Sequence, residues 1–144
     1  MTEKDFLPKE YSQSPKEGSV TWQSPSNIAL VKYWGKKENQ IPANPSISFT
    51  LDHCKTTTTL KFNKRTSALN KNEEFDFAFY FEGKKKEDFK PKIATFFKRI
   101  EQYCAFLKQY HLEISSENSF PHSSGIASSA SGMSALALCL MSLE

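Results

Sequence analysis

Hydroxyl and glycine residues gather in one uncharged stretch near the end of the sequence, residues 118–143. The residues there that could contact an anion are Ser123, Ser124, Gly125, Ser128 and Ser129. Small residues let backbone N–H groups crowd around a phosphate, and the N-terminus of a following helix adds unsatisfied donors and a favourable dipole. The stretch therefore predicts an anion-binding loop. On composition alone, an ordinary serine-rich turn before a buried helix is an equally good interpretation.

A second cluster, Lys32-Tyr-Trp-Gly-Lys-Lys37, follows the apolar run 28–31. Lysines beside an aromatic pair could hold an anionic ligand, with the tyrosine hydroxyl to orient it. Taken alone, the pattern is more typical of a basic strand end with a tryptophan in the core. Together, the two clusters suggest that an anionic substrate and the phosphate chain of a nucleotide meet over a sheet.

Other common sites have no support in the sequence. The five glycines have the wrong spacing for a dinucleotide-binding or Walker-type loop, and there is no His-Glu-x-x-His pair. The three histidines are isolated, and only His122 lies in the serine-rich stretch, with its role open. The three cysteines are far apart and form neither a disulfide framework nor a zinc-binding pattern. No metal ligand is assigned.

Length and composition predict one soluble domain. The 144 residues can bury a core, in which twelve phenylalanines offset a modest apolar content of 38%. A net charge of +3 from scattered lysines gives no reason to expect nucleic-acid binding. The cysteine pattern and a polar N-terminus favour the cytoplasm. Residues 125–143 are nearly long enough to span a membrane, but their serines and alanines favour a buried helix.

Alternating and β-branched segments predict strands at 19–23, 28–31, 46–51, 56–62, 75–81 and 112–116. Residues 24–27 are expected to interrupt the first strands, and 52–55 to turn a hairpin between 46–51 and 56–62. The polar residues 63–74 are expected to form a solvated connection.

Apolar residues at spacings of three and four predict a helix over 88–110, with Lys92 among its outward residues. A second helix follows the serine-rich stretch. Strands early and helices late predict an α+β domain, with helices packed on one face of a largely antiparallel sheet. We expect this domain to cover 19–144, after a loose N-terminal segment over 1–18.

The segment Pro121-His-Ser-Ser-Gly-Ile-Ala-Ser-Ser-Ala130 resembles the phosphate-binding signature Pro-x-x-x-Gly-(Leu/Ile)-x-Ser-Ser-Ala of the GHMP kinase superfamily. Within that superfamily, Ser26-Asn-Ile-Ala-Leu-Val-Lys-Tyr-Trp-Gly-Lys36 is similar to the N-terminal signature of the mevalonate diphosphate decarboxylase family. Segments 44–51 and 56–59 also resemble that family, in the same order. Many members have Thr-Ala-Ala where this chain has residues 122–124.

The resemblance implies the N-terminal fold of the superfamily, which is ribosomal protein S5 domain 2-like. It also implies an ATP-dependent decarboxylation of mevalonate 5-diphosphate to isopentenyl diphosphate, phosphate and CO₂ in isoprenoid biosynthesis, with Mg²⁺. By the match, Lys32 has an electrostatic role on the substrate side, and the substrate site is lined by Tyr33, Trp34 and Lys36. The same match assigns the ATP phosphates to Ser123, Ser124, Gly125, Ser128 and Ser129.

The family is much longer than this chain, and its catalytic aspartate is expected beyond Glu144. We therefore expect a fragment that is inactive alone, with a homodimer or a complementary C-terminal half as the expected assembly. A GHMP-family small-molecule kinase, such as a mevalonate or phosphomevalonate kinase, is the alternative within the superfamily. A non-catalytic half-domain that binds a partner through its uncharged helix is the alternative outside it.

Overall fold

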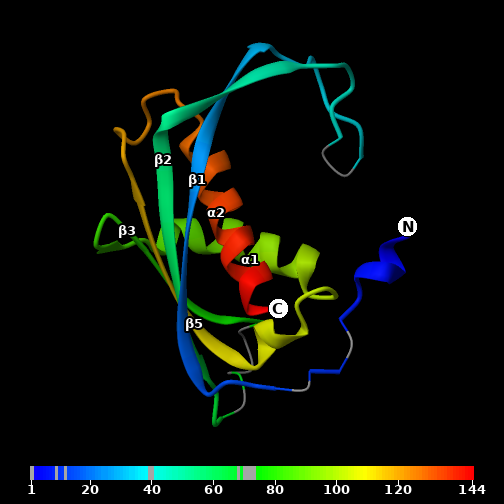
Figure 1. Ribbon diagram of the computed structural model, residues 1–144, viewed down its shortest axis with the longest axis vertical. Helices are drawn as coiled ribbons and strands as arrows, with labels where there is room; N and C mark the ends of the chain where they lie inside the picture. The colour runs from blue at the N-terminus through cyan, green and yellow to red at the C-terminus, as the bar shows by residue number, and fades with distance from the viewer. Residues whose placement is uncertain (1, 9, 12, 39–40, 68, 70–73) are drawn as a thin grey trace.

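Five strands form one sheet in the computed structural model, which describes residues 2–8, 10–11, 13–38, 41–67, 69 and 74–144 (Figure 1). The strands are β1 Glu17–Val31, β2 Ile47–Lys64, β3 Asp76–Phe81, β4 Lys84–Lys85 and β5 Tyr110–Asn118. The α-helices are α1 Lys90–Ile100 and α2 Ser128–Leu143, and 3-10 turns cover Glu3–Phe6, Glu87–Phe89 and Ala105–Lys108.

The sheet has the order β1-β2-β5-β3-β4. β1 pairs antiparallel with β2, and β2 with β5, whereas β3 lies parallel to β5 and antiparallel to β4. α1 and α2 both pack on one face of this sheet (Figure 1). The arrangement confirms the predicted α+β domain with its largely antiparallel sheet.

The core lies between that face and the helices. Inward-facing residues alternate with outward-facing ones along the strands. Ile114 of β5 is one of the inward-facing residues, and its neighbours on the two adjacent strands are Leu60 of β2 and Phe79 of β3. Phe97 of α1 is 0% exposed and meets the ring of Phe77 edge-on, at a centroid distance of 5.2 Å. Aromatic pairs in this arrangement stabilise a core beyond the burial of their area.

β1 is longer than predicted. The expected interruption at 24–27 is wrong, because the strand continues through it with only a register shift between Pro25 and Ser26. β1 is an edge strand of the sheet, and proline, which lacks an N–H, is tolerated on an edge.

The predicted hairpin between 46–51 and 56–62 is also wrong, because both segments belong to β2 and pair with β1. The residues between them bulge: Lys55 lies opposite Pro25, while the next residue of β1 lies opposite Leu51. A hairpin here would leave the outer part of β1 without a neighbour. The predicted connection 63–74 begins too early, because β2 continues to Lys64, and part of it lies outside the described residues.

The predicted helix over 88–110 is too long. α1 ends at Ile100, whose carbonyl accepts a hydrogen bond from the Cys104 N–H at 3.0 Å as the chain turns away. The 3-10 turn Ala105–Lys108 follows and still buries Leu107. The apolar spacing beyond the helix therefore reflects the core that the turn also enters, not a continuing helix.

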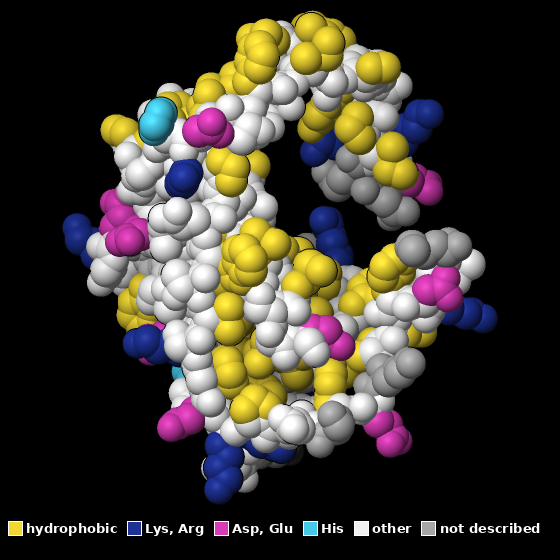
Figure 2. Space-filling view, viewed as in Figure 1, with side chains coloured by type: hydrophobic (Ala, Val, Ile, Leu, Met, Phe, Trp, Pro, Cys, Tyr) yellow, Lys and Arg dark blue, Asp and Glu magenta, His cyan; other side chains and the backbone are white. Residues whose placement is uncertain are grey.

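The outer parts of β1 and β2 and the described residues between them project beyond the helices; we call residues 26–38 and 41–51 the distal ribbon (Figure 1). Figure 2 shows an open hollow between this ribbon and the rest of the molecule. The large apolar side chains exposed on it are Leu30, Val31, Tyr33, Trp34, Ile41, Ile47 and Phe49. Apolar side chains gathered in this way are typical of an interaction surface.

The N-terminal segment contacts the domain near the end of α2. The Tyr11 hydroxyl donates to the Glu144 carboxylate at 2.6 Å, and the Tyr110 hydroxyl donates to the Pro15 carbonyl at 2.8 Å. The pKa of the Tyr11 hydroxyl is raised, mainly by burial and secondly by its hydrogen bond to Glu144. The described part of the chain contains no helix long and apolar enough to cross a membrane.

Candidate functional site

The serine-rich stretch forms a loop, residues 119–127, which enters α2 at Ser128; we call it the serine loop. Three of its residues have a left-handed backbone: Ser123 with φ 62°, Gly125 with φ 80° and Ala127 with φ 44°. Only glycine adopts this conformation without steric cost. The shape of the loop therefore depends on the contacts that hold it.

Buried hydroxyl groups connect the serine loop and the first turn of α2 to the sheet. The Ser26 hydroxyl of β1, on a side chain that is 0% exposed, donates to the Ile126 carbonyl. The hydroxyls of Thr56 in β2 and Ser131 in α2 are hydrogen-bonded at 2.6 Å, and Thr56 also donates to Asn118 Oδ1 at 2.8 Å. Ser131 is 2% exposed and is therefore part of this support, not of a surface that meets a ligand.

α2 begins without a side-chain cap, since its N-cap residue is Ala127. The Ala127 carbonyl accepts hydrogen bonds from the N–H groups of Ala130 and Ser131, at 2.9 and 3.4 Å. The first N–H groups of a helix have no carbonyl partner within the helix, and together with the helix dipole they favour an anion. The uncapped end of α2 is suited to that role.

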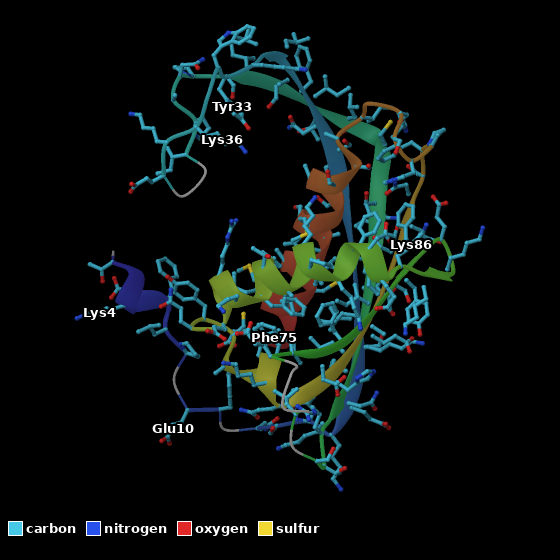
Figure 3. All side chains as sticks on the ribbon, turned by 180° about the vertical axis from the view of Figure 1, so that it is seen from behind. Lys4, Glu10, Tyr33, Lys36, Phe75 and Lys86 are labelled. Carbon is cyan, nitrogen blue, oxygen red and sulfur yellow. The ribbon has the colours of Figure 1, made fainter. Side chains whose placement is uncertain are left out.

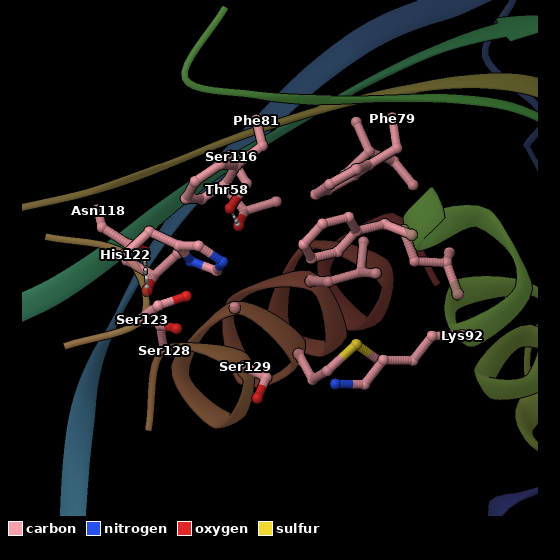
Figure 4. Close-up of a pocket in the computed structure, with 17 residues that line it drawn as sticks. Thr58, Phe79, Phe81, Lys92, Ser116, Asn118, His122, Ser123, Ser128 and Ser129 are labelled. Carbon is pink, nitrogen blue, oxygen red and sulfur yellow. Dashed lines mark hydrogen bonds between the residues drawn. The ribbon is translucent and has the colours of Figure 1, made fainter. Parts of the chain in front are cut away.

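A cavity of about 360 Å³ lies between the sheet, the helices α1 and α2, and the serine loop (Figure 4). This is the size of a small-molecule site. On its floor, the hydroxyls of Thr58 and Ser116 are hydrogen-bonded at 3.0 Å. The other lining residues that are labelled in Figure 4 are Phe79, Phe81, Lys92, Asn118, His122, Ser123, Ser128 and Ser129.

His122 belongs to an aromatic wall of this cavity. Its ring centroid lies 4.9 Å from that of Phe81 and 6.3 Å from that of Phe89. Phe89 in turn stacks on Phe79 at 5.4 Å. The His122 ring is tilted by 58° to that of Phe81 and by 54° to that of Phe89. These rings give the cavity an aromatic side, which suits a planar heteroaromatic group.

The lysine and aromatic cluster lies on the distal ribbon. Lys36 and Tyr33 are neighbours there, with the ammonium nitrogen 5.8 Å from the ring centroid (Figure 3). Trp34 is 88% exposed, and its backbone N–H donates to Asn44 Oδ1 at 2.6 Å. The interpretation of this residue as a core tryptophan is therefore wrong, because the helix layer does not extend over the ribbon (Figure 1).

The structure brings part of the predicted site together. The predicted residues that line the cavity are Ser123, Ser128 and Ser129. Ser124 and Gly125 lie in the same loop but outside the cavity lining. The predicted residues of the distal ribbon, which also do not line it, are Lys32, Tyr33, Trp34 and Lys36. The roles assigned to all of these residues stay predictions.

Several cavity residues were not predicted from the sequence. Lys92 was expected to point outward from α1 and is indeed exposed, but the sequence did not indicate that it would also line the cavity. Phe81 ends the alternating phenylalanines of β3, and that pattern was the available signal. Asn118 ends β5; its buried Nδ2 has no hydrogen-bond partner among the described residues.

No group of three or more histidine, cysteine, aspartate or glutamate side chains that could hold a metal occurs in the described part of the chain. His111 instead contacts the Asp76 carboxylate, with 2.7 Å between Nδ1 and Oδ1, and so links β5 to β3. Cys54, Cys104 and Cys139 are free. Burial raises the pKa of the Cys104 thiol to about 11.

A mostly antiparallel sheet with both helices on one face, and a serine loop that leads into a helix N-terminus, define the N-terminal fold of the GHMP kinase superfamily. Residues 24–144 match the model of one family in particular, described as the diphosphomevalonate decarboxylase-like N-terminal domain. The chain belongs to this family, which confirms the resemblance of its motifs.

Curated and solved relatives agree with this membership. Diphosphomevalonate decarboxylase of Rattus norvegicus is 31% identical in an alignment 145 residues long, which covers 90% of this chain and 34% of that protein. The crystal structure of mevalonate diphosphate decarboxylase from Staphylococcus aureus is 32% identical with a TM-score of 0.70, over 89% of this chain and 38% of the other. A structure of MDDEF in complex with MVAPP, AMPPCP and magnesium is 32% identical with a TM-score of 0.68, over 87% and 37%. The chain spans about one third of the length of the rat protein.

Proposed function

We propose that this chain is the ATP- and substrate-binding N-terminal part of a cytoplasmic enzyme that converts mevalonate 5-diphosphate to isopentenyl diphosphate, phosphate and CO₂. The observation that carries the proposal is the serine loop, which enters the uncapped N-terminus of α2 beside a cavity of about 360 Å³. Family membership supports the reaction, because relatives of this chain are named diphosphomevalonate decarboxylases.

The serine loop and the first turn of α2 hold the phosphates of ATP. The residues present fit this group, since the loop carries no charged side chain that would repel it and the helix end carries no side-chain cap that would compete. Ser123, Ser128 and Ser129 supply hydroxyl donors at the cavity. Ser124 and the backbone at Gly125 continue the loop around the phosphates.

Mg²⁺ binds with the nucleotide, because this ion keeps several waters and is held mainly by substrate phosphates and a few protein oxygens. The hydroxyls of Ser128 and Ser129 are oxygens of that kind. When bound, magnesium would neutralise charge on the phosphates. The solved structure of one relative is a complex with MVAPP, AMPPCP and magnesium, which supports ATP and Mg²⁺ as ligands here. The base of the nucleotide lies against the aromatic wall formed by Phe81 and His122.

The distal ribbon binds the anionic substrate. Lys36 and Tyr33 form one contact surface, in which the ammonium group lies over the aromatic ring. A diphosphate and a carboxylate need cationic partners, and charge-assisted hydrogen bonds are the strongest available to them. Lys32 supports the transfer electrostatically, by stabilising negative charge as the tertiary hydroxyl is phosphorylated and the carboxylate leaves. Trp34 contributes an exposed apolar surface beside them.

Product analysis with the full-length protein tests the proposal. Incubation with MgATP and mevalonate 5-diphosphate is expected to release CO₂ and ADP in equal amounts. ADP without CO₂ would instead identify a small-molecule kinase. The absence of both ADP and CO₂ would contradict the decarboxylase and the kinase assignments alike. Purified residues 1–144 are expected to bind MgATP without turnover, so CO₂ release by this piece alone would contradict the expectation that the catalytic aspartate lies elsewhere. Sedimentation of the full-length protein shows whether it is a homodimer.

A further inference from the structure

Ser26 joins two motifs that are far apart in the sequence. It is completely buried, at the register shift of β1 between Pro25 and Ser26. Its hydroxyl donates to the carbonyl of Ile126, 100 residues away in the serine loop. Ser26 is also the first residue of the segment 26–36 that continues to the lysine and aromatic cluster of the distal ribbon.

This hydrogen bond determines the direction of the next backbone donor. A trans peptide unit is planar, and its carbonyl and N–H point in opposite directions. Because the Ile126 carbonyl points toward Ser26 in the sheet, the N–H of Ala127 points away from the sheet. Ala127 immediately precedes α2, so this N–H belongs to the group of donors at the helix N-terminus.

Ala127 does not hold this orientation through its own preference. Its φ of 44° is left-handed, a conformation that alanine adopts only where its surroundings require it. The first part of the loop is attached elsewhere: the Ser119 hydroxyl donates to the His53 carbonyl at 2.8 Å and accepts the Lys55 N–H at 2.9 Å. The Ser26 bond is therefore a direct contact between the sheet and the last turn of the loop.

We propose that Ser26 is a positioning residue, whose hydroxyl holds the end of the serine loop in the conformation that binds nucleotide phosphates. The inference rests on the proposed function, because that function assigns the loop to the nucleotide. Ser26 acts through the Ile126 peptide and makes no contact with the nucleotide itself.

Hydrogen exchange and nucleotide titration of the full-length protein test this role together. In Ser26→Ala, amide exchange of residues 122–130 is expected to be about tenfold faster, since one buried hydrogen bond is lost. The Kd for Mg-AMPPCP is expected to rise by a similar factor. Ser26→Thr keeps a hydroxyl and is expected to restore slow exchange and tight binding, which a loss of packing alone would not predict.

Ser24→Ala is the matched control. Ser24 lies two residues earlier on the same buried side of β1, is 5% exposed, and makes no hydrogen bond to the serine loop within the described residues. Its loop exchange and Kd are expected to equal those of the wild type. If Ser26→Ala behaves like Ser24→Ala in the exchange experiment, the proposal is overturned.

Two further outcomes are decisive. If the wild type binds no Mg-AMPPCP, the proposed function fails, and with it the nucleotide role of Ser26, while the exchange data show separately whether the hydroxyl holds the loop. If Ser26→Ala does not fold, Ser26→Cys fills the same space with a weak donor. Faster loop exchange in that variant with weaker Mg-AMPPCP binding supports the proposal, and exchange equal to the wild type overturns it.

Discussion

Gly125→Ala tests the serine loop with little steric disturbance. The φ of 80° at Gly125 is strained for any residue with a side chain, but an added Cβ would meet no heavy atom within 4 Å. The left-handed conformation costs alanine about 1–2 kcal/mol, while reduced freedom of the unfolded chain returns about 0.4–1 kcal/mol. A net cost of about 1 kcal/mol follows.

That cost is expected to affect binding more than folding. The loop has open space around Gly125, so the free protein relaxes toward a negative φ and avoids the strain. Nucleotide binding must then restore the left-handed backbone at its full cost of about 1–2 kcal/mol, because the unfolded chain takes no part in binding. This cost corresponds to a Kd about 5- to 30-fold higher. Calorimetric titration with Mg-AMPPCP measures this change, and urea unfolding measures stability.

Gly83→Ala is the control for strain alone. Gly83 lies in the turn between β3 and β4, has a φ of 74°, and likewise has no heavy atom within 4 Å of an added Cβ. We expect the same small change in stability with an unchanged Kd for Mg-AMPPCP. Equal nucleotide affinities for the Gly125 and Gly83 variants would refute the reasoning.

Three further predictions concern the core, the substrate surface and the cysteines. Phe97→Ala is expected to destabilise the protein by about 3–5 kcal/mol in urea unfolding, because the side chain is 0% exposed. Lys36→Ala is expected to raise the KM for mevalonate 5-diphosphate at least about tenfold, because a charge-assisted contact is lost. The Kd for Mg-AMPPCP is expected to stay unchanged. A higher Kd for Mg-AMPPCP with an unchanged KM would contradict the place of Lys36 on the substrate side. Iodoacetamide at pH 8 is expected to modify the half-buried Cys54 before Cys104, whose pKa is raised by burial to about 11. A raised pKa favours the neutral thiol in the folded state, so the stability from Cys104 is full below its ordinary pKa of 9.0 and falls as the pH rises toward 11. The decline is expected to be smaller in Cys104→Ala.

Strands and helices that are buried on one side were predicted well, because their apolar residues repeat at a regular spacing. The alternating phenylalanines of 75–81 predict a strand, and β3 covers all but the first of these residues. The spacing of apolar residues over 93–100 likewise marks part of α1, because a half-buried strand and a half-buried helix each have one characteristic repeat. The hairpin at 52–55 was wrong for a reason outside those residues. Whether the chain turns or bulges there depends on β1, which offers pairing groups to both halves of β2.

The serine loop, the helix after it and the motif at 26–36 could be recognised from the residues alone, and through them the family. Each of those features is local, so residue type and spacing are enough to recognise it. The packing of the elements, by contrast, was needed to learn that Phe81 of β3, Lys92 of α1 and His122 of the loop line one cavity. It also decided that the distal ribbon extends away from the helices and that Ser26 reaches the Ile126 carbonyl. These contacts depend on the order of the strands in the sheet and on where the helices pack. A local repeat of residues encodes neither of them.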